Sequence, residues 1–199
     1  MRTLPRPFVL ASTSPYRRAL LERLGVAFEI ASPQVDEEVL KRDLRDPEAL
    51  VLALAREKAR SLAARFPEAL ILGSDQAVDL DGEVLGKPGT PEAAVRQLLR
   101  LAGREHRLLT AVALHDARSG ETRDHTDVHV VRLRSITEAE ARDYVLRDRP
   151  LECAGAYRVE SLGIALVESL RGEDYTAVIG LPLMAVVSLL AAAGSPVLG

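Results

Sequence analysis

The feature that most restricts the fold of this chain is a short apolar run that leads through a tight polar loop into a helix. Residues 8 to 11 are apolar, three hydroxyl side chains follow, and residues 16 to 24 have helical character. Ser14 can cap this helix, Pro15 suits its first position, and Gly25 is a natural left-handed stop. The order strand, loop, helix predicts a sheet covered by helices.

Further strand and helix patterns follow along the chain. Expected strands cover residues 26–31, 70–73, 106–115 and 124–134, a hairpin covers 77–85, and strand-like runs occur within 155–167. Expected helices cover 46–65 and 90–103, begin again at a capping box of Thr137 and Glu140, and end with 183–193. Asp36, Glu37 and Glu38 are expected in a polar loop. Because the elements do not alternate strictly, the sequence predicts the α/β class, with a mixed, elongated and twisted sheet flanked by helices in a single domain of residues 1–199.

Length and composition exclude several classes of protein. The 199 residues suffice for one domain, or for two small lobes, with a hydrophobic core. An apolar fraction of 47% against 28% charged residues is far from the composition of disordered chains. The net charge of −3 argues against a nucleic-acid partner, and residues 1–11 resemble neither a secretion signal nor a membrane span. The single cysteine, Cys153, cannot form an internal disulfide, so we expect a cytoplasmic protein.

Lysine is rare in this chain, and each lysine is therefore a candidate site residue. Of the 26 basic residues, only Lys41, Lys58 and Lys87 are lysines. Lys58 lies four residues after Leu54 and four before Leu62, on the stripe that must face the core. Its charge must therefore reach solvent, pair with a carboxylate or enter a polar cleft. Lys87 projects from a Gly-Lys-Pro-Gly loop, where an ordinary exposed lysine is the alternative.

The loop before the first helix has the features of a phosphate site. Arg17 and Arg18 lie in the first helical turn, where the helix dipole disfavours positive charge. A bound anion would compensate, and backbone N–H groups together with the hydroxyl of Ser12 and its neighbours would contact it. The loop lacks the spacing of a Walker P-loop. A capped helix with solvated arginines is the alternative.

Carboxylates occur at two places that suit a metal ion. Asp75 follows the apolar run 70–73, and Asp36 and Glu37 belong to the polar loop. Side chains at strand ends are often functional in α/β proteins, and oxygen ligands suit Mg²⁺ or Mn²⁺. The four histidines and Cys153 lack the spacing of a zinc site, so we interpret the histidines as structural.

Segments spread over nearly the whole chain resemble the Maf family of nucleotide pyrophosphatases. They are LASTSPYRRALLERLG from Leu10, the Asp36-Glu37 pair, AREKA around Lys58, GSDQ at 73–76, GKP at 86–88, CAGAYRVESLG from Cys153 and GLPL at 180–183. Their shared order and spacing make the resemblance specific. One departure is Thr110-Ala111, where the family usually has Thr-Gly.

The resemblance implies a fold of the Maf and ITPase type, with two lobes around a nucleotide cleft. It also implies that a nucleoside triphosphate is hydrolysed between its α and β phosphates, with a divalent metal cation, Mg²⁺ or Mn²⁺, as cofactor. The implied roles are activation of water by Asp75, metal binding by Glu37 and Asp75, and phosphate binding by the catalytic side chains Lys58 and Lys87 and by Arg17, with Ser12 and Arg18 in support.

Three residues resemble the branch of the family that acts on 7-methyl-GTP. The chain has Tyr16, Gln76 and Glu160 where the branch acting on dTTP and UTP tends to have Arg, Thr and Gln. A 7-methylguanine ring is cationic, so the carboxylate of Glu160 and the aromatic face of Tyr16 would both attract it. Cation–π stacking on Tyr16 would contribute roughly 0.5–2 kcal/mol. Gln76 would hydrogen-bond a base edge. The alternatives are a dTTP/UTP pyrophosphatase of the same family and a nucleotide-binding regulator of septum formation with little turnover. Whether the chain forms a homodimer is left open.

Overall fold

The computed structural model describes all residues 1–199, which divide into two compact units. The first unit comprises residues 1–75, 110–127 and 174–199, and the second comprises 76–109 and 128–173. One mixed sheet has the strand order β2-β1-β3-β5-β6-β7, with β4 paired to β3. Three of its strands, β3, β5 and β6, have residues in both units.

The elements follow one another in mixed order. The strands are β1 (Phe8–Ala11), β2 (Glu29–Ala31), β3 (Leu70–Leu80), β4 (Glu83–Leu85), β5 (Glu105–Asp116), β6 (Thr122–Leu133) and β7 (Val167–Arg171). The α-helices are α1 (Pro15–Glu22), α2 (Glu37–Asp43), α3 (Pro47–Arg60), α4 (Pro91–Leu101), α5 (Glu138–Asp148), α6 (Tyr175–Ile179) and α7 (Leu183–Ala192), and two 3₁₀ turns are η1 (Ala154–Ala156) and η2 (Leu162–Leu166). The predicted α/β class and the mixed sheet flanked by helices are confirmed.

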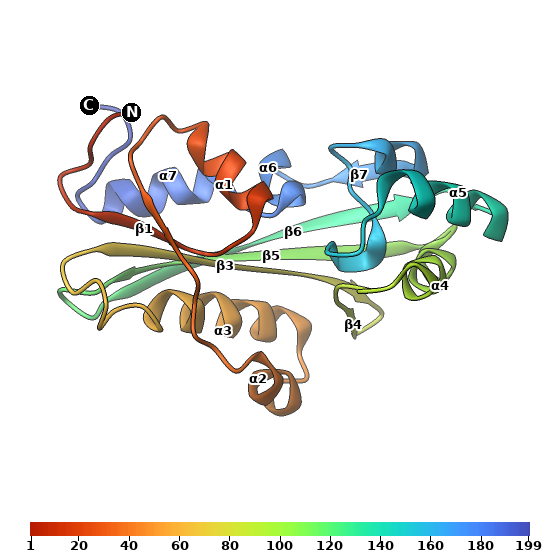
Figure 1. Ribbon diagram of the computed structural model, residues 1–199, viewed down its shortest axis with the longest axis horizontal. Coiled ribbons are helices and arrows are strands. Elements are labelled where there is room, and N and C mark those ends of the chain that lie inside the picture. The colour runs from red at the N-terminus through yellow and green to blue at the C-terminus, as the bar shows by residue number, and fades with distance from the viewer. The chain divides into compact units, whose positions relative to one another are not determined.

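In the first unit, the sheet is buried on both faces. Strand β1 is parallel to β2 on one side and to β3 on the other. Side chains alternate along β3, so Leu70 and Leu72 pack with α1 and α7, whereas Ile71 packs with Ala59 of α3. Figure 1 shows α1 and α7 on one side of these strands and α3 on the other. The continuous apolar runs at residues 8–11 and 70–73 follow from this burial on two faces.

Helix α3 approaches β3 very closely. Asp46 caps the helix by accepting a hydrogen bond from the backbone N–H of Ala49 at 2.8 Å. A Cβ atom added at Gly73 would lie 2.2 Å from the carbonyl oxygen of Ala55 and 2.7 Å from the backbone nitrogen of Ala59. Only glycine therefore allows the helix to lie at this distance from the strand.

The second unit combines a hairpin, two helices and an antiparallel edge. Strand β4 pairs with β3 after the expected turn, in which Asp81 and Gly82 both have positive φ angles. Strand β7 pairs antiparallel with β6. The predicted capping box of α5 is confirmed, since Thr137 and Glu140 each accept a hydrogen bond from the other's backbone.

Two expectations about residues 36–38 and 70–75 are wrong. Residues 36–38 are not a polar loop, because Asp36 caps α2 and Glu37 and Glu38 form its first turn. The strand expected at 70–73 continues to Leu80, so Asp75 lies within β3 rather than after it. Residues such as Ser74 and Asp75 disfavour strands in isolation, but pairing within the sheet overrides this preference.

The segment expected to contain strands at 155–167 forms two 3₁₀ turns, and strand β7 begins only at Val167. Gly155 has a φ of 71°, which a strand does not accommodate. The short helix α6 was not expected. None of the helices combines the length and the apolarity that crossing a bilayer requires. The nucleotide cleft and the single domain of residues 1–199 stay predictions.

Candidate functional site

The ammonium group of Lys58 lies between two carboxylates in the first unit. Its Nζ is 2.6 Å from Oδ1 of Asp75 on β3 and 2.8 Å from Oε1 of Glu37 on α2. The side chain of Lys58 is 10% exposed and that of Asp75 is 14% exposed, so both charges are largely withdrawn from water. Of the three outcomes open to a lysine on an apolar stripe, the structure shows pairing with carboxylates.

The packing of α3 on β3 fixes this contact. Leu54 and Ala55 are buried on the same helical face as Lys58, and Ala59 lies against Gly73. A long side chain at position 58 therefore points along the strand toward Asp75, two residues after the close contact. In the GSDQ segment, Gly73 thus allows α3 to approach β3, and Asp75 contacts the lysine that α3 carries.

Helix α2 supplies the second carboxylate and separates the roles of Asp36 and Glu37. Asp36 accepts a hydrogen bond from the backbone N–H of Glu38 at 3.2 Å, so its side chain serves as the helix cap. Burial alone would raise the pKa of Glu37, but the hydrogen bond and charge of Lys58, helped by Lys41, outweigh burial and lower it. Glu37 is therefore ionised at neutral pH.

Arg17 on α1 belongs to the same unit and interacts electrostatically with the same two carboxylates. Its Nε donates to the carbonyl oxygen of Gly180 at 3.0 Å, and its Nη1 lies 3.5 Å from Oγ of Ser12. Burial lowers the pKa of Arg17, while the negative charges of Asp75 and Glu37 act in the opposite direction. A half-buried guanidinium whose side-chain hydrogen bonds go to neutral groups is suited to receive an anion.

Several residues that hold this region together were not expected from the sequence. Ser74 donates to the carbonyl oxygen of Gly180 at 3.2 Å, and Thr110 donates to that of Ala177 at 2.9 Å. Ala111, the departure from the family pattern, is fully buried. In the sequence, Ser74 and Gly180 are marked only by the GSDQ and GLPL segments. Neither segment reveals that the two residues are hydrogen-bonded, because they are distant in sequence.

Asp174 is the other unexpected member. It is buried and accepts hydrogen bonds from Oγ1 of Thr176 at 2.6 Å and from the backbone N–H of Met184 at 2.8 Å. Oγ1 of Thr176 in turn accepts from the backbone N–H of Leu183 at 2.8 Å. These bonds fix the turn that presents the Gly180 carbonyl to Arg17. An Asp two residues before a Thr is a capping pattern that a sequence reading could have used.

Two predicted residues of α1 differ in their surroundings from Arg17. Arg18 is exposed, and its Nε pairs with Oε1 of Glu22 one turn later at 2.8 Å. The structure therefore gives Arg18 a partner on its own helix, which is the solvated alternative. Tyr16 is half-buried at the start of the helix.

Gln76, Lys87 and Glu160 belong to the second unit. Gln76 is half-buried on β3 directly after Asp75. Lys87 is exposed, with its Nζ 3.3 Å from Oε2 of Glu152. Glu160 lies at the surface of its unit, yet partial burial of its carboxyl raises its pKa, with the charge of Asp148 adding to the effect and that of Arg158 opposing it.

The protein's possible metal ligands in the first unit are Glu37 and Asp75. No group of three or more His, Cys, Asp or Glu side chains gathers into a metal site. A cage built from protein ligands alone is therefore absent, but Mg²⁺ is commonly held by one or two carboxylates together with substrate phosphates and water. The pair fits that mode. His106 is buried against Tyr157, and burial lowers the pKa of His106 to about 4, which agrees with a structural role.

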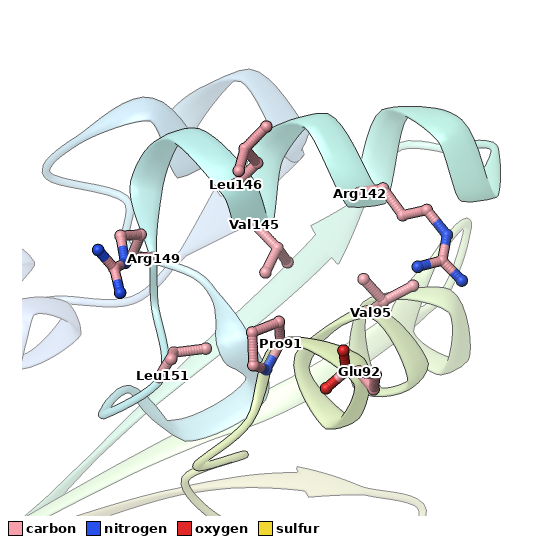
Figure 2. A pocket seen from close by; sticks show the side chains of 8 residues that line it. All are labelled: Pro91, Glu92, Val95, Arg142, Val145, Leu146, Arg149 and Leu151. Carbon is pink, nitrogen blue, oxygen red and sulfur yellow. The ribbon is translucent and has the colours of Figure 1, made fainter.

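A pocket of about 560 Å³ lies in the second unit between α4 and α5. Figure 2 shows Val95 of α4 and Val145 of α5 facing one another across it, with Arg142 and Arg149 at its edges. No residue predicted for the site lines this pocket. Its walls also carry no carboxylate other than Glu92 and no lysine, so it has no counterpart of the cluster of Lys58, Asp75 and Glu37, here called the Lys58 cluster.

The chain is similar to known proteins over nearly its whole length. A family model described as Maf-like protein matches residues 7–193. A 7-methyl-GTP pyrophosphatase of Syntrophotalea carbinolica is 48% identical over 192 residues, which cover 96% of each chain. A 7-methyl-GTP pyrophosphatase of Xanthomonas campestris pv. campestris is 49% identical over 193 residues, covering 96% of this chain and 97% of the relative. Among solved structures, a HAM1 protein from Coxiella burnetii is 14% identical with a TM-score of 0.43, and the match covers 67% of this chain and 73% of that one.

Proposed function

Because this chain belongs to the family of Maf-like proteins, we propose that it is a nucleotide pyrophosphatase that converts 7-methyl-GTP to its monophosphate and pyrophosphate. The observation that carries the proposal is the Lys58 cluster. A buried lysine held by Glu37 and Asp75, with the half-buried Arg17 in the same unit, combines a proton acceptor with cations for phosphate. The relatives named as 7-methyl-GTP pyrophosphatases support the substrate.

The proposed reaction is the attack of water on the anhydride linkage between the α and β phosphates. The oxygen of water forms a bond to the α phosphorus. The bond from the α phosphorus to the oxygen that bridges it to the β phosphate breaks, and pyrophosphate leaves. Asp75 accepts the proton of the attacking water, because it is the least exposed carboxylate of the cluster and lies on a rigid strand. Lys58 orients Asp75 and, with Arg17 and Lys87, binds phosphate oxygens, with Ser12 and Arg18 in support.

Charge balance supports a divalent cation in this reaction. Lys58 and Arg17 only offset the charges of Glu37 and Asp75, which leaves Lys87 and Arg18 as the remaining proposed cations against a strongly anionic triphosphate. Mg²⁺ or Mn²⁺ would neutralise charge on the phosphates as it develops. Glu37 and Asp75 would hold it, and their oxygen donors match the preference of such hard cations.

The charge of the base supports 7-methyl-GTP as substrate. The methylated ring is cationic, and we assign its recognition to the carboxylate of Glu160 and the aromatic face of Tyr16. Gln76 would hydrogen-bond the edge of the base. We place the enzyme in the cytoplasm, which accords with the single free cysteine, Cys153.

The test is pyrophosphate release from a panel of 7-methyl-GTP, GTP, dTTP, UTP, CTP and ITP with Mg²⁺ or Mn²⁺. The native protein should prefer 7-methyl-GTP, and Asp75→Asn should lower kcat by roughly 10²-fold or more, since general-base catalysis contributes about that much. Glu168→Gln, at an exposed carboxylate that pairs with Arg132, is a control for changing a carboxylate elsewhere.

Each result has a definite meaning. A preference for dTTP or UTP would keep the reaction and overturn the assignment of Tyr16, Gln76 and Glu160. An Asp75→Asn variant with native turnover would remove Asp75 as the base. Nucleotide binding without pyrophosphate release from any substrate would favour a regulator over an enzyme.

A further inference from the structure

Glu160 is the one exposed residue in a stretch of anchored neighbours. Between residues 157 and 163, all positions except Glu160 are buried or half-buried. Tyr157 and Val159 are 5% and 4% exposed, and Gly163 is buried. The backbone therefore presents a single carboxylate at the surface while the residues on both sides are fixed.

The anchoring residue is Asp148, at the end of α5. The guanidinium of Arg158 donates to it twice, with Nη2 2.8 Å from Oδ1 and Nε 3.2 Å from Oδ2. Ser161 lies with its Oγ 2.9 Å from Oδ1, and the hydroxyl of Tyr144 donates to Oδ2 at 2.8 Å. Asp148 thus binds residues on both sides of Glu160, two positions before it and one position after it.

The backbone around Glu160 is closed by the same group. Tyr144 accepts a hydrogen bond from the backbone N–H of Arg158 at 3.1 Å, and the backbone N–H of Ser161 donates to the carbonyl oxygen of Arg158 at 3.3 Å. A Cβ atom at Gly163 would lie 2.3 Å from that carbonyl oxygen. The chain folds back tightly onto Arg158, so the backbone is constrained on both sides of Glu160.

We propose that Asp148, Tyr144, Arg158 and Ser161 form a positioning cluster that fixes Glu160 for recognition of a cationic base. The cluster touches no substrate itself and acts through Glu160. This inference rests on the proposed function, because it assumes that Glu160 contacts the 7-methylguanine ring. It adds the residues that determine specificity without contacting the ligand.

The electrostatics of the cluster agree with this role. Burial alone would raise the pKa of Asp148, but hydrogen bonds from Arg158, Tyr144 and Ser161 outweigh burial and lower it. The positive charge of Arg158 is therefore matched by Asp148, and the carboxylate of Glu160 is left for a ligand. A cationic ring is the class of base that gains most from such a carboxylate, whereas the neutral guanine of GTP gains much less.

The test compares kcat/KM for 7-methyl-GTP with that for GTP, which differ by the charge of the base. Glu160→Gln should lower this ratio roughly 10- to 100-fold, as expected when a charged hydrogen-bond partner is lost. Asp148→Asn should lower the ratio at least several-fold, mainly through KM for 7-methyl-GTP. Asp143→Asn is the matched control, because Asp143 lies on α5 but pairs only with the exposed Arg147. It should leave the ratio unchanged.

The double variant Asp148→Asn/Glu160→Gln makes the argument specific. If Asp148 acts through Glu160, the ratio in the double variant should equal that of Glu160→Gln alone. If the ratio in the double variant falls by the product of the two single-variant effects, Asp148 acts independently of Glu160 and the positioning role is overturned. A native ratio in Asp148→Asn, with a collapsed ratio in Glu160→Gln, would also overturn it while leaving the proposed function intact.

Two further results separate this inference from the proposed function. No hydrolysis of 7-methyl-GTP by the native protein would overturn both, whereas a native ratio in Glu160→Gln would overturn the role of Glu160 and of its cluster but not the pyrophosphatase activity. If Asp148→Asn does not fold, Ser161→Ala and Tyr144→Phe each remove the hydrogen bonds of one hydroxyl of the cluster and must lower the ratio for the proposal to stand.

Discussion

At the scale of single residues, one ammonium group determines the character of the candidate site. Lys58 contacts Asp75 and Glu37 at hydrogen-bond distance, so removing Lys58 would leave the largely buried Asp75 without this partner, whereas removing one carboxylate would leave Lys58 with the other. Asp75 and Glu37 come from different elements, so the lysine also connects α2 with β3. The same contact is therefore structural and, by our proposal, chemical.

The shape of the lysine head group matters as well as its charge. We predict that Lys58→Arg lowers kcat by roughly 10²-fold, because a planar guanidinium cannot occupy the position of a compact ammonium 2.6 Å from Asp75 without displacing it. Steady-state pyrophosphate release measures this effect. Lys41→Arg makes the same exchange at an exposed lysine that also pairs with Glu37, and it should change kcat by less than about threefold. Equal effects of both variants would contradict the assignment.

The sequence predicted Lys58, Asp75 and Glu37 as site residues but not that Lys58 contacts both carboxylates. A lysine between Leu54 and Leu62 on a helical stripe is conspicuous, since a local period of 3.6 residues places it toward the core. Whether it reaches solvent or a carboxylate depends on tertiary packing. The bond from Arg17 to Gly180 spans 163 positions, and no local pattern encodes such a contact.

At the scale of elements, the contact between α3 and β3 sets the geometry of the site. The helix carries Lys58, the strand carries Asp75, and Gly73 allows their backbones to touch. Elements packed this closely transmit small displacements, because backbone atoms cannot rotate away as side chains can.

We predict that Gly73→Ala destabilises the fold by about 1–3 kcal/mol, because the added Cβ collides with the backbone of Ala55 and Ala59. It should also lower activity by moving Lys58 away from Asp75. Urea denaturation with a parallel activity assay measures both effects. Gly86→Ala is the matched control for stability, since a Cβ there meets nothing within 4 Å, and it should stay within about 0.5 kcal/mol of the native protein.

Element prediction succeeded where local signals were strong. Ser14, Asp46, Thr90 and Thr137 all cap helices as their residue types indicate. It failed where pairing or left-handed glycines decided the outcome, as in the continuation of β3 through Asp75 and the turns around Gly155. Aspartate and serine are poor strand formers by themselves, and the sheet overrides that preference.

At the scale of the whole molecule, ion pairs between distant segments set the response to acid. Arg6 near the start of the chain donates to both carboxylate oxygens of Asp116 at the end of β5, at 2.6 and 2.7 Å. This bidentate pair, with backbone N–H groups of Arg118 and Ser119, holds the pKa of Asp116 far below its usual value. The folded state therefore releases this proton more readily than the unfolded state.

The direction of the pH effect follows from that shift. The contribution of Asp116 is fully present above the unfolded pKa of about 3.9 and is lost as pH falls toward the folded pKa. We predict that Asp116→Asn lowers the free energy of unfolding by roughly 1–2 kcal/mol at pH 7, and that the difference from the native protein shrinks below about pH 4. Urea denaturation between pH 3 and pH 7 measures this. Asp143→Asn, on an exposed pair, should follow the native curve, and a pH-independent deficit in Asp116→Asn would contradict the argument.

The division of the chain into alternating stretches has a consequence for how the protein is made. The second unit has all of its residues once position 173 has been synthesised, whereas the first unit still lacks residues 174–199. The core of the first unit includes Leu181, Val186 and Leu190, and Arg17 donates a hydrogen bond to the Gly180 carbonyl oxygen. Part of the apolar surface of residues 1–75 therefore stays uncovered until residues 174–199 have been synthesised. A nascent chain that stops short of α7 would carry Lys58 and Asp75 without the α7 side chains of the surrounding core, so the candidate site matures only after α7 has been synthesised.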